Sequence, residues 1–169
     1  MEGSDGTWIE ACKSGQRAAF EPLVRRYGPR AYRFALALVR DAEEAKDLSQ
    51  EAFIRAYVSM HRFDSERPFY PWFLTILRNV CLSHLRRRRV KVDLEQIPEL
   101  EDRRELSPDV KVRVEQALMS LSTHDREILE LKAFQDLSYR EISELLEIPR
   151  GTVMSRLYHA RRRFKDAMT

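Results

Sequence analysis

The side chains best suited to binding a partner lie near the C-terminus. Val153, Leu157, Ala160 and Phe164 follow steps of four, three and four residues, so they share one face of a helix. The opposite face carries hydrogen-bonding, aromatic and basic side chains, which can contact the base edges and phosphates of a nucleic acid. These outward residues are Arg150, Met154, Ser155, Tyr158, His159 and Arg162.

The residues before this helix predict how it is positioned. Ser138 followed by Glu141 fits a capping box, and the turn 148–151 then separates two short helices, as in a helix-turn-helix. We therefore predict base contacts from Arg150, Met154, Ser155, Tyr158 and His159. We predict phosphate contacts from Thr152, Arg156 and Arg163. Taken alone, this segment also fits an ordinary helical hairpin with a charged surface.

A second group of candidates lies in the middle of the chain, on a predicted helix over 68–88. Aromatic residues precede Arg78, Asn79 and a basic block over 86–89; they are Phe69, Tyr70, Trp72 and Phe73. Aromatic rings beside cations can stack on unpaired bases along a neutralised backbone. An aromatic cluster at helical spacing also fits a core, and we expect Trp72 and Phe73 to be mostly core.

The charge is unevenly distributed, although the net charge is only +3. Basic residues gather over 86–91 and again over 150–165, and an acidic stretch between them includes Asp93, Glu101 and Glu105. Two basic clusters joined by an acidic tether are expected of a chain that contacts one polyanion at two sites.

The sequence lacks the patterns of an enzyme. It has no glycine-rich phosphate loop, no clustered metal ligands and no paired nucleophile and base. We therefore predict a protein that is not an enzyme and needs no cofactor. Cys12 and Cys81 lie far apart, which favours reduced, buried thiols. No signal-peptide pattern and no apolar run of bilayer length occurs, so we expect a cytoplasmic location.

The elements that position these residues are expected to be helices. Amphipathic spacing predicts helices over 16–39, 41–60 and 68–88, with Asp41 capping the second and Pro29 bending or interrupting the first. Four shorter helices are predicted over 110–121, 123–134, 138–146 and 150–168. Residues 90–108 lack periodicity and carry two prolines.

The predicted fold class is therefore all-α, with two small helical domains joined by an extended acidic linker. We place the domains at 1–89 and 109–169 and the linker at 90–108, and the C-terminal domain is a helix-turn-helix. The sequence leaves open whether the two domains pack together, because such a linker permits both arrangements.

Three runs of the sequence resemble, in order and spacing, the extracytoplasmic-function (ECF, group 4) sigma factors of bacterial RNA polymerase. They are AEEAKDLSQEAFIRAY, FYPWFLTILRNVCLSHLRRRR and LSYREISELLEIPRGTVMSRLYHARRRF. The first is similar to the family's core-binding region, the second to its promoter-melting region and the third to its promoter-recognition region. The resemblance covers nearly the whole chain.

This resemblance implies a sigma factor that binds core RNA polymerase and directs promoter-specific initiation. It implies a sigma region 2-like N-terminal domain whose contacts with the β′ clamp helices come from Asp47, Gln50, Glu51 and Arg55. It implies that the minus-ten element is melted and captured by Phe69, Tyr70, Arg78, Asn79, Ser83 and Arg86. The region 4-like C-terminal domain is expected to read the minus-thirty-five element with the outward face of the last helix.

The resemblance also implies a protein partner. An anti-sigma factor is expected to cover the polymerase-binding surfaces, and a membrane-anchored one would hold the chain at the membrane. Ser83, Met154 and His159 depart from the residues frequent in the family, which affects the promoter sequence read. The alternative function is a stand-alone helix-turn-helix regulator, which needs a sensing or dimerising N-terminal half; the aromatic and basic third helix argues against it.

Overall fold

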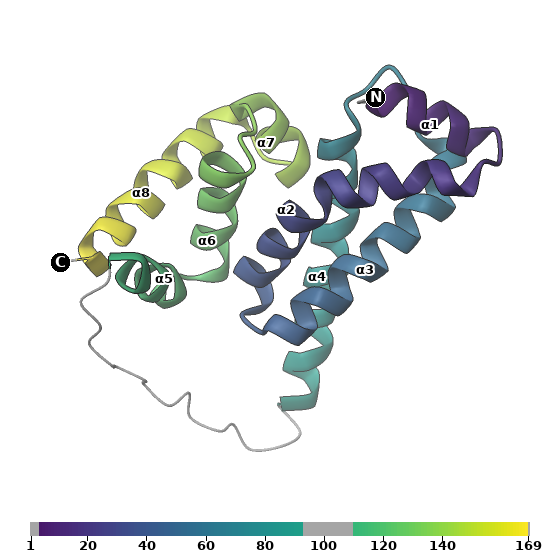
Figure 1. Ribbon diagram of the computed structural model, residues 1–169. Helices are drawn as coiled ribbons and strands as arrows, with labels where there is room; N and C mark the ends of the chain where they lie inside the picture. Colours follow the sequence, from purple (N-terminus) through teal and green to yellow (C-terminus); the bar gives the residue numbers. More distant parts are fainter. Residues whose placement is uncertain (1–3, 93–109, 169) are drawn as a thin grey trace.

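The computed structural model describes residues 4–92 and 110–168, which form eight α-helices and no strand (Figure 1). The N-terminal half comprises α1 (Asp5–Lys13), α2 (Glu21–Val39), α3 (Ala42–Ser59) and α4 (Phe69–Val92). The C-terminal half comprises α5 (Val110–Ser120), α6 (Thr123–Leu129), α7 (Tyr139–Leu146) and α8 (Arg150–Met168). A π turn, Glu130–Phe134, continues α6. The all-α fold class is confirmed.

The N-terminal half is a bundle in which α2, α3 and α4 pack on one another around aromatic rings. Phe73 of α4 is fully buried and stacks on Phe53 of α3, with 4.3 Å between the ring centroids. Phe34, Leu38 and other aliphatic side chains fill the remaining space. Burying each of these large side chains contributes about 1.5–3 kcal/mol, so this bundle is held mainly by apolar contacts.

Several helices begin at side-chain caps that the sequence indicates. The Asp41 carboxylate accepts a hydrogen bond from the Glu44 backbone N–H at 2.9 Å and starts α3. Ser138 and Glu141 form both bonds of the capping box that starts α7. Both caps satisfy backbone N–H groups that have no partner inside the helix, and both predictions are confirmed.

The first two helices differ from the sequence-based expectation. α2 continues through Pro29, because its buried stripe of Ala31, Phe34 and Leu38 compensates for the hydrogen bond that proline cannot donate. α1 was not predicted. Its signal is the Ser4 cap, whose side chain accepts from the Thr7 backbone N–H, followed by apolar residues three apart.

The two halves pack directly against each other. α2 lies against α6 and the π turn, and α4 lies against α7, so the helices of the C-terminal half cover one side of the N-terminal bundle (Figure 1). Buried apolar residues of both halves join one continuous cluster. This answers the question that the sequence left open. The predicted linker falls mostly on 93–108, outside the described residues.

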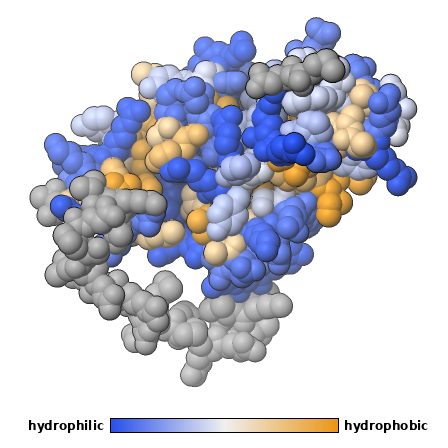
Figure 2. All heavy atoms as spheres, in the orientation of Figure 1, coloured by the Kyte–Doolittle hydropathy of each residue, from blue (hydrophilic) through white to orange (hydrophobic). Residues whose placement is uncertain are grey.

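The surface is largely polar, and the cysteines lie beneath it. Hydrophilic residues cover most of the face in Figure 2, while hydrophobic residues surface along α2 and α3. Cys12 and Cys81 are buried free thiols, as predicted, and burial raises the pKa of Cys81 to about 12, which disfavours its thiolate form. Among the described helices, none combines the length and the apolar character that crossing a membrane requires.

Candidate nucleic-acid interface

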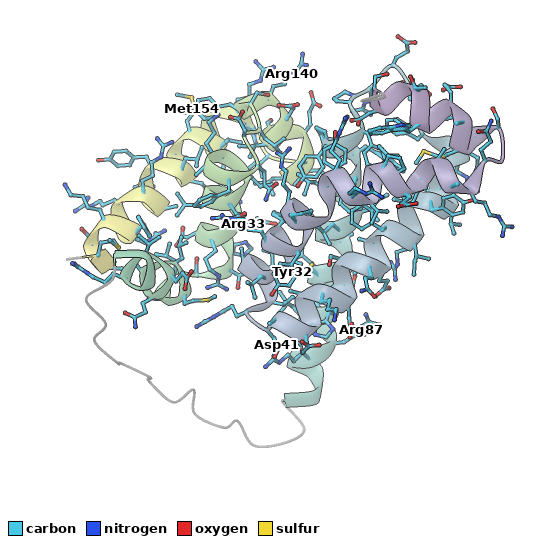
Figure 3. The ribbon with its side chains drawn as sticks, in the orientation of Figure 1. Tyr32, Arg33, Asp41, Arg87, Arg140 and Met154 are labelled. Atoms are coloured by element: carbon cyan, nitrogen blue, oxygen red, sulfur yellow. The ribbon has the colours of Figure 1, made fainter. Side chains whose placement is uncertain are left out.

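The outer face of α8 is exposed over its whole length. Met154 and Tyr158 retain 57% and 64% of their accessible surface, while Val153 and Leu157 on the opposite face are buried. Figure 3 shows Met154 on the side of α8 that points away from α2 and α4. The other predicted base-contacting residues are exposed beside them: Arg150, Ser155 and His159. The structure therefore brings all five predicted base readers onto one solvent-facing strip.

The predicted phosphate contacts flank this strip unevenly. Arg156 is exposed and Thr152 is half-buried, with its backbone oxygen accepting from the Ser155 hydroxyl at 3.1 Å. Arg163 differs, because its guanidinium donates to Asp125 of α6 at 2.7 Å. A phosphate contact from Arg163 competes with this ion pair, although 59% of the arginine side chain remains exposed.

The turn between α7 and α8 fixes the angle of α8. Glu147 ends α7 in the left-handed conformation, with φ of 56°, and the Ile148 N–H returns to the Ser143 carbonyl at 3.1 Å. The Ser143 hydroxyl donates to the Ile148 carbonyl at 2.6 Å. These bonds close the turn from both sides. Because α7 is packed on the core through Ile142 and Leu145, it positions α8.

A second exposed strip runs along α4. Asn79 and Arg86 are exposed and Ser83 is half-buried, and their spacing of four and three residues places them on one helix face. The Arg86 guanidinium donates to the Ser83 hydroxyl at 3.3 Å. An amide, a hydroxyl and a guanidinium in one row can donate to and accept from a nucleic-acid strand.

Phe69 and Tyr70 lie in the core, which corrects the expectation that their rings face DNA bases. Phe69 is 2% exposed and packs among other aromatic rings, including Phe73 and Phe63. Tyr70 stacks on Tyr27, with 4.6 Å between the centroids. Both rings lie on the apolar face of α4 and therefore pack into the core. Phe73 is buried in the core, as predicted, and Trp72 is half-buried.

Arg78 lies in the same helix but is engaged by the C-terminal half. Its Nε donates to Glu127 Oε1 at 2.6 Å, and only 20% of its side chain is exposed. Arg78 therefore differs in its surroundings from Asn79, its exposed neighbour in the sequence. In this arrangement Asn79, Ser83 and Arg86 are open to a strand, while Arg78 is held by an ion pair.

The predicted polymerase-binding residues lie on the outer side of α3. Asp47, Gln50 and Arg55 are exposed, and Arg55 pairs with the half-buried Glu51 at 2.5 Å. Two residues that the sequence analysis missed also lie on this helix: Ile54 and Val58, with 65% and 66% of their surface exposed. The sequence could have indicated them, because both are apolar residues at positions of α3 that do not face the core.

An open groove between α2 and α3 adjoins this surface. Its volume is about 460 Å³, and its lining includes Val24, Tyr32, Lys46, Gln50 and Phe53. The lining is mainly apolar and uncharged, with one acidic and one basic residue, and such a lining suits a protein partner better than a polyanion. Among the described residues, no group of three His, Cys, Asp or Glu side chains is placed to bind a metal ion.

Comparison with known proteins shows the family of the chain. Residues 23–90 match Sigma-70 region 2 and residues 111–164 match Sigma-70, region 4. The chain is 32% identical to the RNA polymerase sigma-H factor of Pseudomonas aeruginosa, over 97% of this chain and 93% of that protein. It is 30% identical to the ECF RNA polymerase sigma factor SigW of Bacillus subtilis, over 90% of each chain.

Solved structures show the same fold. RpoE, solved in complex with the anti-sigma factor NepR from Bartonella quintana, gives a TM-score of 0.75 at 25% identity, covering 88% of this chain and 96% of that one. CnrH, solved with the cytosolic domain of CnrY, gives 0.73 at 25% identity over 96% and 95% of the two chains. With both sigma regions matched in order and relatives aligned over almost its full length, this chain belongs to the ECF family of RNA polymerase sigma factors.

Proposed function

We propose that the chain binds core RNA polymerase and directs initiation at specific promoters, while the polymerase supplies all catalysis. The observation that carries the proposal is the exposed outer face of α8, where the five side chains predicted to contact bases follow a capped helix-turn-helix. The C-terminal half, 109–169, reads the minus-thirty-five element. The N-terminal half, 1–89, docks on the polymerase and captures the opened strand, and 90–108 tethers the two.

The surfaces of the N-terminal half divide this work between two helices. The outer side of α3 binds the β′ clamp helices through Asp47, Gln50, Glu51 and Arg55, and the exposed Ile54 and Val58 add apolar contact there. The row Asn79, Ser83 and Arg86 on α4 holds the minus-ten strand. The exposure of Asn79 beside hydrogen-bonding neighbours supports this role.

An anti-sigma factor controls the chain by covering the outer side of α3 and the adjoining groove. RpoE, to which this chain is similar, was solved with such a partner. The protein acts in the cytoplasm, and a membrane-anchored anti-sigma factor holds it at the membrane until a signal releases it.

Reconstituted transcription tests the proposal. Purified chain and core polymerase are mixed with a library of promoter sequences, and specific initiation is expected only when the chain is present. Asn79→Ala is expected to weaken strand opening, and Ser155→Ala to weaken duplex recognition. Ser120→Ala is the matched control, because its hydroxyl also bonds a carbonyl three residues back, but on α5.

The outcome separates two functions. Specific initiation with distinct defects in the two variants supports the proposal. Tight duplex binding by the chain alone, without any stimulation of core polymerase, would instead identify a stand-alone helix-turn-helix regulator.

A further inference from the structure

The seam between the two halves carries a row of arginines from the N-terminal side. Arg33 of α2 donates from Nε to Glu130 Oε1 at 3.0 Å, and Arg78 of α4 donates from Nε to Glu127 Oε1 at 2.6 Å. Figure 3 shows Arg33 lying between α2 and α6. Both carboxylates belong to the C-terminal half, so the ion pairs join the halves.

Arg30 extends this row and meets the residue at the centre of the seam. Its Nη2 donates to the backbone oxygen of Gln135 at 2.6 Å, and its guanidinium lies 4.2 Å from the centre of the Tyr70 ring. Gln135 is 1% exposed. Its amide nitrogen donates to the Arg30 carbonyl and to Glu130, and its amide oxygen accepts from the Tyr70 hydroxyl. Every polar group of this side chain therefore has a partner when the halves are closed.

An arginine of the C-terminal half also donates across the seam. Arg126 of α6 donates from Nε to the Ala37 carbonyl at 2.7 Å, and burial lowers the pKa of Arg126 to about 10. The seam thus buries charged groups of both signs. Glu127 and Glu130 are paired with arginines, whereas Arg126 donates to backbone carbonyls and a hydroxyl, and all three lose hydration.

The ion pairs across the seam add little to the stability of the closed arrangement, beside the apolar contacts that the two halves share. Glu127 and Glu130 retain 3% and 5% of their side-chain surface, and burial raises the pKa of Glu130 although Arg33 opposes the shift. Removing paired charges from water costs nearly as much as their attraction returns, so buried ion pairs add little net stability. An alternative anion for the arginines can therefore compete with the carboxylates.

Phosphate is an anion that these arginines can bind in place of the carboxylates. A guanidinium binds carboxylate and phosphate with the same fork of N–H donors. Arg78 adjoins the exposed Asn79, and Arg33 is half-exposed, with its guanidinium 3.5 Å from the centre of the Phe134 ring. The row continues from the candidate strand-binding strip of α4 onto α2.

We propose that Arg30, Arg33 and Arg78 form a phosphate-binding row for single-stranded DNA, and that Glu127 and Glu130 occupy this row in the closed chain. The inference rests on the proposed function, in which α4 captures an opened strand, and it adds a surface on α2. The strand and the C-terminal half then compete for one set of cations. The outer face of α8 stays exposed meanwhile, so duplex reading does not require opening.

Neutralising the two carboxylates tests the competition. Glu127→Gln combined with Glu130→Gln keeps the size of both side chains but weakens their hold on the arginines. The variant is expected to open, seen as a longer distance between dyes on the two halves. It is expected to bind a short, labelled single-stranded oligonucleotide about tenfold tighter by fluorescence anisotropy.

Three further variants separate opening from charge. Glu21→Gln with Glu115→Gln makes the same change in net charge at exposed positions and is expected to give a much smaller gain. Gln135→Ala breaks the seam without changing charge and is expected to open the chain and raise affinity. Adding Arg33→Gln and Arg78→Gln to the neutralised variant is expected to remove the gain.

The results distinguish failure of the arginine row from failure of the proposed function. The inference is overturned if the exposed control gains as much affinity, if opening brings no gain, or if neither variant opens. Core-dependent transcription by the unmodified chain is measured in parallel. Specific transcription without the affinity gain rejects the arginine row alone, whereas absence of both rejects the proposed function as well.

Discussion

The outer faces of α8 and α4 are both candidates for DNA contact, but the tertiary structure treats them differently. On α8, Met154 and Tyr158 stand in solvent, because only the opposite face is needed to pack on α5, α6 and α7. α4 is central and packs on α2, α3 and α7, so Asn79 alone is exposed over 69–85, while Arg78 is paired with Glu127.

This difference teaches that a reading helix at the edge of a fold can stay ready for duplex DNA, whereas a helix at its centre shares its side chains with the core and with other elements. Under the proposed function, the surface for duplex DNA is fully exposed in the closed chain. The proposed strand-binding surface is exposed in part, and the proposed arginine row would join it only when the two halves move apart.

Truncating a core side chain of α4 is expected to have the largest effect on stability. Phe73→Ala removes a ring that is fully buried against Phe53, so the free energy of unfolding falls by about 3–5 kcal/mol. Met154→Ala on α8 is expected to change it by less than about 0.5 kcal/mol. Urea unfolding followed by circular dichroism measures both, and Met60→Ala, a buried methionine, controls for residue type. Equal costs for Phe73 and Met154 would contradict the contrast.

Arg78→Ala is expected to open the seam rather than unfold either half. The change leaves Glu127 buried without its cation, which costs the closed arrangement about 3 kcal/mol. Opening returns Glu127 to water, so the urea midpoint should move little while the distance between dyes on the two halves increases. Arg163→Ala, which removes a more exposed ion pair inside the C-terminal half, should leave that distance unchanged. An unchanged distance in Arg78→Ala would show that this pair does not hold the seam.

Two substitutions on α8 are expected to separate affinity from sequence preference. Arg156→Ala should weaken binding to every duplex alike and reduce the salt slope of log K by about 1. Met154→Ala should change the ranking of minus-thirty-five sequences, by roughly 1–3 kcal/mol at the contacted base pair. Binding isotherms at several salt concentrations distinguish them, with Arg17→Ala as a basic control outside α8. If Met154→Ala leaves the ranking of minus-thirty-five sequences unchanged, Met154 does not contact a base.

The capping box of α7 is expected to give the smallest effect, and one that depends on pH. Hydrogen bonds from Ser138 hold the pKa of Glu141 below its usual 4.5. Because the folded pKa is the lower one, this stabilisation is complete above the unfolded value and is lost as the pH falls through the folded value. Ser138→Ala should cost about 1 kcal/mol at neutral pH.

Thermal unfolding at neutral and acidic pH measures the capping effect. Glu141→Gln should remove the part of the acid sensitivity that comes from the box, whereas the exposed Glu144→Gln should not. If Glu141→Gln keeps the full acid sensitivity, other carboxylates account for it.

The sequence alone determined the local architecture. Helix ranges, the caps at Asp41 and Ser138, and the outward face of α8 follow from periodicity and from neighbours three or four residues apart, which act within one element. α1 escaped prediction because a nine-residue helix offers few turns of periodicity.

Only the tertiary structure decided which of these side chains are free. The bonds of Arg78 to Glu127, Arg33 to Glu130 and Arg30 to Gln135 join residues 49, 97 and 105 positions apart. No local pattern specifies such partners, because a guanidinium in sequence looks the same whether it meets solvent, phosphate or carboxylate. The burial of Phe69 and Tyr70 was likewise settled by which helices surround them, since an aromatic ring suits a core and a base stack equally.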